Sequence, residues 1–146
     1  MDSLKVDVGG DPAKAACRVR SVDLAPTAQV WFIEHDDYYG AREIYPARED
    51  TAERAAFFGR AALDACLQLG WIPDVIHCHD WTTGLIPVLL NTTLKSSPLG
   101  RCATVLSIHN LQHQGLLSRR ILPFLRLPER LFKPEELECL GGVNFL

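Results

Sequence analysis

The sequence predicts an α/β fold with a Rossmann-like parallel sheet and helical crossovers. Short apolar, strand-like runs occupy residues 29–33, 75–78 and 103–108. Helix-like segments at 51–69 and 82–94 separate them. Strands that alternate with helices in this way form parallel sheets joined by crossovers. The length of 146 residues and the 47% hydrophobic composition are typical of one globular domain, or of part of one.

The first third of the chain is less regular. Residues 1–28 contain a turn cluster at 9–12 and a possible short strand over 15–22. The run 29–33 is β-branched and aromatic, which predicts a buried strand. A loop is expected to follow it as far as Arg48, with Tyr38, Tyr39 and Tyr45-Pro46 along its length. Long loops with several aromatics are more often binding loops than plain connectors.

Residues that typically start, stop or kink helices set the limits of the predicted helices. Asp50, with Glu53 three residues later, forms a capping-box-like start, and Gly70 provides a stop, so a helix is expected over 51–69. The second helix, over 82–94, contains Pro87, which lies near its first turn or kinks it. Three later prolines divide the rest into short helices or turns. The final residues are apolar and carry no stop signal, which suggests a chain cut inside a structural unit.

Composition excludes several classes of protein. The net charge of -3, from 15 basic and 18 acidic residues, provides no excess of positive charge for binding nucleic acid. No run approaches the about 20 apolar residues of a membrane span, so no membrane partner is expected. The first residues lack the basic and then apolar order of a secretory signal, so an intracellular location is expected. The five cysteines are scattered without a CxxC pair, which predicts reduced, buried thiols.

Polar motifs follow two of the predicted strands. His77–Trp81, read His-Cys-His-Asp-Trp, ends one strand and opens a helix, and His109–Gly115 follows the next strand. Both therefore lie at the carboxyl edge of the sheet, where open α/β folds bind ligands. In an extended segment His77 and His79 share one face. Asp80 is predicted to cap the helix, a role compatible with ligand binding.

The chemistry of these motifs favours a sugar over a metal. Asn, Gln and neutral His offer directional donors and acceptors that suit sugar hydroxyls. A metal-dependent hydrolase remains an alternative, but there is no HExxH pair. The side chains that could serve as ligands are His77, His79, Asp80, His109 and His113.

Five ordered segments resemble bacterial glycogen synthases and plant or algal starch synthases. They comprise residues 31–38, 52–63, 73–81, 107–115 and 140–146. The resemblance implies part of the N-terminal domain of a GT-B glycosyltransferase, which transfers glucose from ADP-glucose to the non-reducing end of an α-1,4-glucan with retention. No cofactor and no metal are implied, because ADP-glucose is the donor substrate.

The resemblance also implies roles for individual residues. His109 and Asp80 are expected to be catalytic and to lie beside the transferred glucose. The expected substrate-binding residues are Asn110, Gln114, Tyr38, Tyr39 and His79.

The resemblance covers residues 29–146, which are expected to be a partial, acceptor-side domain. Residues 1–28 look like a divergent or truncated start, since Lys5–Gly10 does not reproduce the family's K-x-G-G-L loop. The C-terminal nucleotide-sugar domain is absent, so the chain is expected to be inactive alone. A non-catalytic glucan-binding module is the alternative. The expected compartment is cytoplasm in a bacterium, or plastid in a plant or alga.

Overall fold

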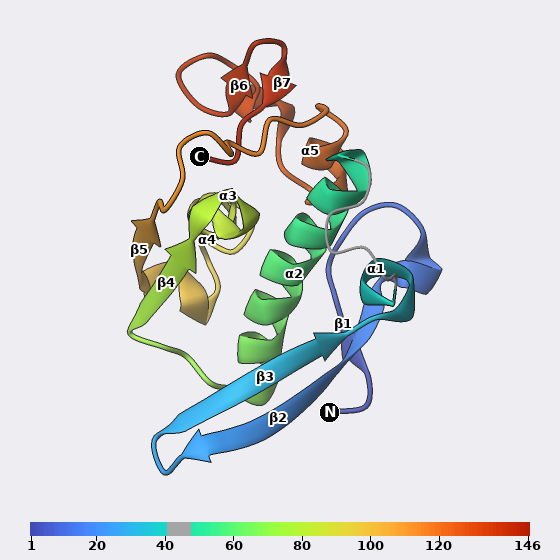
Figure 1. Ribbon diagram of the computed structural model, residues 1–146, viewed down its shortest axis with the longest axis vertical. Helices are drawn as coiled ribbons and strands as arrows, with labels where there is room; N and C mark the ends of the chain where they lie inside the picture. The colour runs from blue at the N-terminus through green and yellow to red at the C-terminus, as the bar shows by residue number, and fades with distance from the viewer. Residues whose placement is uncertain (41–47) are drawn as a thin grey trace.

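A computed structural model of the chain describes residues 1–40, the backbone of 48–50, and residues 51–146. The long helix α2 (Arg48–Leu69) runs through the middle, and the other elements pack around it (Figure 1). The helix predicted over 51–69 is confirmed. It begins before Asp50, so Asp50 lies in its first turn and not at the N-cap. Phe57 and Ala61 on this helix are completely buried.

The first 34 residues form an antiparallel sheet in the order β1-β2-β3. These strands are β1 (Leu4–Lys5), β2 (Ala16–Ala25) and β3 (Ala28–Glu34), and the 3₁₀-helix η1 (Pro12–Lys14) lies between the first two. The short strand expected over 15–22 is thus confirmed, and it extends to Ala25. The turn between β2 and β3 is so short that the two strands can only form a hairpin.

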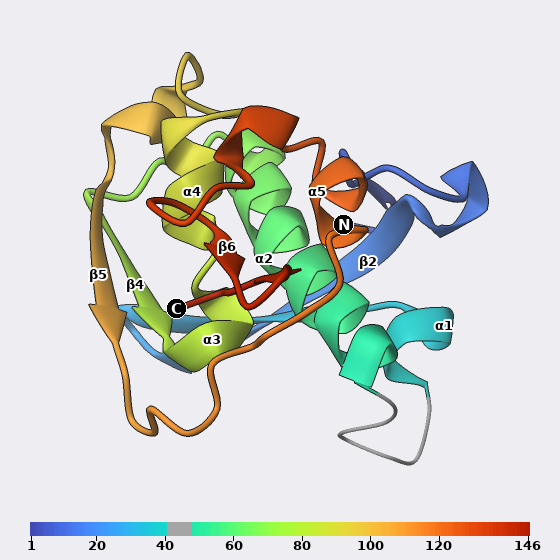
Figure 2. The same cartoon turned by 90° about the horizontal axis from the view of Figure 1, so that it is seen from above.

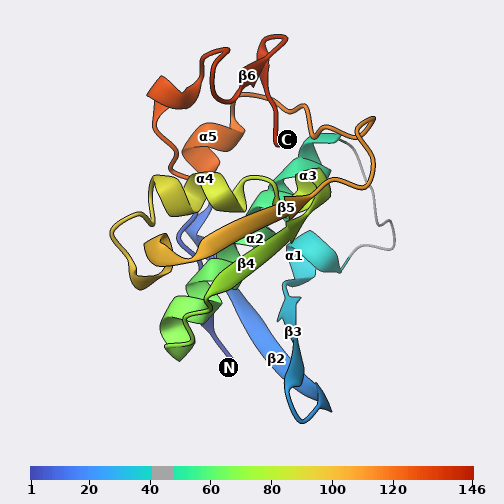
Figure 3. The same ribbon diagram turned by 90° about the vertical axis from the view of Figure 1, so that its left-hand side faces the viewer.

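The prediction that 29–33 is a buried strand of the parallel sheet is wrong. β3 pairs antiparallel with β2, and its residues are exposed or half-buried. The tip of the hairpin projects beyond the end of α2 (Figure 3). Of the hairpin residues only Cys17 and Val19, near the start of β2, are buried. Apolar composition identified the strand, but only the neighbouring strand decided its pairing.

The parallel part of the prediction is confirmed in a second sheet. β4 (Val75–His79) pairs in parallel with β5 (Ala103–Ser107), with His77 opposite Val105. In Figure 2 this pair forms one wall, and the connecting helices lie between it and α2. Burial of the strand at 75–78 was predicted, yet among its residues only Cys78 is buried and Val75 is 53% exposed.

The single helix predicted over 82–94 is replaced by two short helices and turns. The helices are α3 (Asp80–Thr83) and α4 (Ile86–Asn91), and the 3₁₀-helix η2 (Pro98–Arg101) follows them. Gly84 is the C-cap of α3, and only glycine fits there, because a Cβ would lie 1.9 Å from the Phe145 carbonyl oxygen. Pro87 lies in the first turn of α4, which is the first of its two predicted positions.

The loop predicted after residue 33 contains a helical turn, α1 (Asp36–Tyr39). His35 is its N-cap, and the His35 ring accepts a hydrogen bond from the Tyr38 amide at 3.4 Å. Acidic residues in the first turn favour this helix by complementing its dipole. The predicted loop aromatic Tyr45, with Pro46, lies outside the described residues.

The C-terminal segment folds over the amino-terminal end of α2 as short elements, as the prolines predicted. They are α5 (Ile121–Phe124), the 3₁₀-helix η3 (Glu129–Leu131), and the paired strands β6 (Glu138–Cys139) and β7 (Gly142–Val143). Leu122 and Val143 are fully buried in the core. An isolated bridge between Leu117 and Val143 ties this segment to the polar loop after β5.

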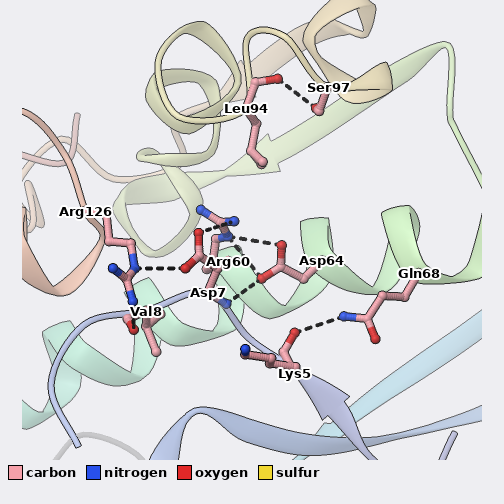
Figure 4. Close-up of polar contacts among 9 residues, drawn as sticks. All are labelled: Lys5, Asp7, Val8, Arg60, Asp64, Gln68, Leu94, Ser97 and Arg126. Carbon is pink, nitrogen blue, oxygen red and sulfur yellow. Dashed lines mark hydrogen bonds and ion pairs between the residues drawn. The ribbon is translucent and has the colours of Figure 1, made fainter. Parts of the chain in front are cut away.

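A partly buried ion cluster fastens the amino-terminal loop to α2 (Figure 4). Arg60 and Asp64 are buried, whereas Asp7 and Arg126 are more than half exposed. The Arg60 guanidinium contacts both oxygens of Asp64 at 3.0 to 3.1 Å and the Asp7 carboxylate at 3.0 Å. Arg126 contacts the other oxygen of Asp7 at 2.8 Å. The Asp7 amide in turn donates to Asp64 at 2.8 Å. Three segments far apart in sequence therefore meet at this cluster.

All five cysteines are free thiols, as predicted. Cys17, Cys66 and Cys78 are buried, whereas Cys102 and Cys139 are only half-buried. Burial raises the pKa of the Cys78 thiol, an effect that outweighs its hydrogen bond with Thr83. Burial, followed by the nearby Asp64 charge, raises the pKa of Cys17 to about 11. These two thiols therefore stay protonated at neutral pH.

No helix among the described residues is both long enough and apolar enough to cross a lipid bilayer.

Candidate functional site

The carboxyl ends of β4 and β5 carry the candidate site. A direct bond joins the two strand ends, because the Asp80 carboxylate accepts the His109 backbone N–H at 2.6 Å. Asp80 has φ 56°, a left-handed conformation that is uncommon outside glycine. Such a conformation persists where the surroundings hold it, and it is common at functional sites.

The prediction that Asp80 is the N-cap is wrong. His79 is the N-cap of α3, and Asp80 is its first helical residue. The left-handed turn at Asp80 directs its carboxylate across to the next strand, where the carboxylate accepts the His109 amide. The carboxylate therefore joins the ends of β4 and β5 instead of capping the first turn of α3.

Three histidines line up on the open face of the two strands. The rings of His77 and His79 have centroids 4.2 Å apart, which confirms that both lie on one face. His79 stacks on His109 at an interplanar angle of 8°, with Nδ1 of His79 3.1 Å from Nε2 of His109. This contact needs a proton on one nitrogen and a lone pair on the other. At the far end, Nε2 of His77 lies 2.8 Å from the Ser107 hydroxyl.

Thr83 holds His79 in place from α3. Its hydroxyl accepts the His79 amide at 2.7 Å and donates to the His79 carbonyl at 2.8 Å. This double contact fixes the backbone at the strand end, from which the His79 ring reaches His109. Sequence reasoning missed Thr83, since only the turn into α3 brings its hydroxyl back to the strand.

A cavity of about 560 Å³ opens beside these strand ends. Its walls combine one large aromatic ring, Trp81, with several neutral polar groups. The lining residues are Thr51, Asp80, Trp81, Thr82, Asn110, Gln112, His113, Gln114, Gly115 and Leu117. An aromatic wall with convergent amides and one carboxylate suits a neutral, polyhydroxylated ligand.

Internal hydrogen bonds orient the amides of this cavity. The Asn110 side-chain oxygen accepts a hydrogen bond from the Gln112 backbone N–H at 2.9 Å. The Gln114 side-chain oxygen accepts from Asn144 at 3.0 Å. Gly115, at φ 63°, lies against the Trp81 ring, so close that a Cβ would be 2.7 Å from the Trp81 ring carbon Cε3. The C-terminal segment thus helps to shape the cavity.

The structure brings together most, but not all, of the predicted site residues. Asp80, Asn110 and Gln114 line the cavity, while His79 and His109 form the adjoining stacked pair. Trp81 and Gln112 also line it without having been predicted as site residues, although both belong to the two polar motifs.

The two predicted tyrosines lie elsewhere, on α1 against α2. Tyr38 is 8% exposed and stacks on Phe57, with ring centroids 4.6 Å apart. Tyr39 is half-buried, and its hydroxyl donates to the Arg54 carbonyl at 3.0 Å. Burial, followed by the charge of Glu53, raises the pKa of Tyr38 to about 12. Their predicted contact with substrate stays a prediction.

Across residues 1–40 and 51–146, no three His, Cys, Asp or Glu side chains are grouped so that they could hold a metal ion. The histidine row therefore does not form a ligand set in this arrangement.

Comparison with known proteins assigns the family. The sequence pattern of the starch synthase catalytic domain matches residues 2–146. The chain belongs to the starch synthase catalytic domain family.

Curated relatives in this family include bacterial glycogen synthases. The chain is 45% identical over 121 residues to that of Desulforudis audaxviator, an alignment covering 82% of this chain and 24% of the relative. It is 42% identical over 128 residues to that of Pseudothermotoga lettingae, covering 87% and 26% respectively. The chain spans about a quarter of the length of these relatives.

A solved structure extends the likeness to the fold. The catalytic domain of starch synthase IV from Arabidopsis thaliana, bound to ADP and acarbose, superposes with a TM-score of 0.82 at 25% identity. The match covers 98% of this chain and 30% of the Arabidopsis chain. The predicted fold class, an α/β part of a GT-B glycosyltransferase, is confirmed by this match.

Proposed function

We propose that this chain supplies the sugar-binding side of a retaining glucosyltransferase, which transfers glucose from ADP-glucose to the non-reducing end of an α-1,4-glucan. The observation that carries the proposal is the cavity lined by Trp81 and neutral amides, next to the bond between Asp80 and His109. Similarity to glycogen synthases and to a starch synthase bound to ADP and acarbose supports it.

The proposed reaction breaks the bond between glucose C1 and the phosphate oxygen, and ADP leaves. A new bond forms between C1 and the 4-hydroxyl oxygen of the acceptor, whose proton passes to the departing phosphate oxygen of ADP. The sugar passes through a cation-like state that an anionic or dipolar environment favours. One Asp80 oxygen accepts the His109 amide, and the carboxylate charge stands beside the cavity.

His109 is proposed to hold a hydroxyl of the transferred glucose. Its Nε2 contacts His79 Nδ1, so His79 influences which ring nitrogen of His109 carries the proton. Asn110 and Gln114 are proposed to bind further hydroxyls, since both line the cavity. The reaction needs no resident cofactor or metal in this proposal.

ADP-glucose is proposed to bind mainly through a C-terminal domain that lies outside this chain. The chain covers about a quarter of each relative, which is consistent with donor binding by a part of the protein outside this chain. The alternative function, a module that binds glucan without transferring glucose, is compatible with the same coverage. The bacterial glycogen synthases among the relatives support a cytoplasmic location.

An NMR titration with maltoheptaose tests the proposed site. Shifts of the side-chain amides of Asn110 and Gln114 are expected, and Trp81→Ala should raise the dissociation constant about tenfold by removing the stacking surface. Phe32→Ala is the matched control, because Phe32 is an exposed aromatic on the outer face of the hairpin. A folded chain whose amides do not respond to the glucan would contradict the proposal.

Titration with ADP-glucose then tests whether the donor binds outside this chain. Negligible affinity of this chain, together with glucan binding, is the expected result for the acceptor side of an enzyme. Glucose incorporation by the complete protein, measured with labelled ADP-glucose, distinguishes the enzyme from a binding module. Glucan binding without any incorporation by that protein would favour the module.

A further inference from the structure

A second hollow lies on the opposite part of the molecule, between the β2–β3 hairpin and the end of α2. It has a volume of about 890 Å³. Its walls include two of the three tryptophans of the chain, Trp31 and Trp71, whereas Trp81 belongs to the strand-end cavity. We call this hollow the hairpin groove, and its remaining lining residues are Met1, Val19, Ser21, Asp23, Ala25, Pro26, Thr27, Ala28, Gln29 and Leu69.

The end of α2 positions Trp71 for this groove. Gly70, at φ 65°, ends the helix, and its amide donates to the Leu67 carbonyl at 3.2 Å. The Trp71 amide donates to the Cys66 carbonyl at 2.9 Å, which completes a Schellman motif. The turn brings the Trp71 ring to 5.4 Å from the Trp31 ring, measured between centroids, with an interplanar angle of 62°. Trp71 is nevertheless 56% exposed, so its ring offers a free surface.

A row of polar groups lies on the same face of the hairpin. Ser21 pairs with Trp31 across the strands, and Asp23 pairs with Gln29. Since alternate residues share a face, these four side chains point to the same side. The Gln29 amide nitrogen donates to Asp23 at 2.8 Å, and the Trp31 indole N–H donates to the Gln29 oxygen. These bonds fix the orientation of the amide before any ligand arrives.

These features select a class of ligand. The side chains that line the groove carry one charge, that of Asp23, and none of them is basic, so they favour a neutral ligand over a phosphate or another anion. Tryptophan faces stack on the apolar faces of sugar rings, while amide, carboxylate and hydroxyl groups bind the hydroxyls at the ring edges. The two rings are steeply inclined to each other. This geometry suits a curved α-1,4-glucan better than the flat ribbon of a β-1,4-glucan.

We propose that the hairpin groove is a second α-1,4-glucan site, distinct from the strand-end cavity, which holds a more distant part of the same polymer. The identity of the sugar rests on the proposed function, whereas the location rests on the groove itself. A long chain held at two places has a higher effective concentration at each of them.

The three tryptophans allow both sites to be followed in one experiment. The chain is labelled with 5-fluorotryptophan, and maltoheptaose is titrated while the fluorine NMR signals are recorded. Trp31 and Trp71 report on the hairpin groove, and Trp81 reports on the strand-end cavity. We expect the signals of Trp31 and Trp71 to shift together with one dissociation constant.

Two variants and a second sugar complete the test. Trp71→Ala should raise the dissociation constant reported by Trp31 about tenfold, because it removes the exposed stacking ring. Phe32→Ala, which removes an exposed aromatic from the opposite face of the hairpin, should leave it unchanged. Gln29→Ala provides a second groove variant that keeps both rings, and it should also weaken binding. Cellohexaose should bind much more weakly than maltoheptaose.

The outcomes distinguish this inference from the proposed function. If only the Trp81 signal responds, the groove is not a glucan site, although the proposed function stands. If only Trp31 and Trp71 respond, the inference holds and the strand-end proposal fails for this chain. Equal binding of cellohexaose, or wild-type affinity in both Trp71→Ala and Gln29→Ala, would overturn the inference.

Discussion

Replacing Arg60 by methionine tests how the buried pair of the ion cluster, Arg60 and Asp64, stabilises the fold. The Arg60 side chain is 4% exposed and that of Asp64 is 8% exposed, so both charges are nearly removed from water. Arg60→Met keeps much of the side-chain volume but leaves the Asp64 carboxylate without its cation. The Asp7 amide remains as a donor to Asp64 at 2.8 Å, and Arg126 remains as a partner of Asp7.

The expected loss follows from the cost of an unpaired buried charge. Removing one partner of a buried pair destabilises a protein by about 3–5 kcal/mol. One nitrogen of the guanidinium, Nη1 of Arg60, is itself buried without a hydrogen-bond partner among the described residues. Its removal offsets about 1 kcal/mol of desolvation cost. We therefore expect Arg60→Met to lower the free energy of unfolding by about 2–4 kcal/mol.

A double variant separates charge from packing. Arg60→Met combined with Asp64→Leu removes both charges, and its stability should lie within about 1 kcal/mol of the wild type. Urea unfolding followed by far-UV circular dichroism measures both variants. The reasoning is refuted if the single variant loses less than about 1 kcal/mol, or if the double variant is less stable than the single one.

Three further results are expected. Gly115→Ala should cost about 2–4 kcal/mol in urea unfolding, because φ 63° disfavours a Cβ that would also lie 2.7 Å from Trp81; wild-type stability would contradict this. Asp80→Ala should speed hydrogen exchange of the His109 amide about tenfold or more, whereas Asp80→Asn, which keeps an acceptor oxygen, should change it little. The folded state raises the pKa of Cys17 from 9.0 to about 11, so the unfolded chain loses this proton first and stability should fall between these pH values. Cys17→Ala should make that fall shallower in thermal melts recorded across the same range, and an identical slope would count against it.

The candidate site could be predicted because its two motifs are continuous in sequence. Residues 77–81 and 109–115 each follow a strand, and parallel pairing of β4 with β5 brings both to one edge. The prediction for Asp80 failed in detail, since capping preferences say nothing about the left-handed turn that directs its carboxylate to His109. Thr83 was missed because its role depends on that same turn.

Burial could not be predicted in the same way. The run 29–33 has the composition of a buried strand, yet the hairpin turn pairs it with β2 and leaves it partly exposed. For Tyr38 the difference is the reverse: an aromatic side chain expected on a binding loop is buried. It packs on Phe57 because His35 begins a helical turn there. In both cases the neighbours in space, which a local pattern does not contain, decided the outcome.

The sequence by itself determined the family, the long central helix and the parallel pair of strands, because each depends on patterns within short segments. Only the tertiary structure decided which polar groups meet. The stacking of His79 on His109 and the pairing of Trp31 with Trp71 join residues that are 30 and 40 positions apart. Such contacts depend on how helices and strands pack, and a small change in a turn redirects them.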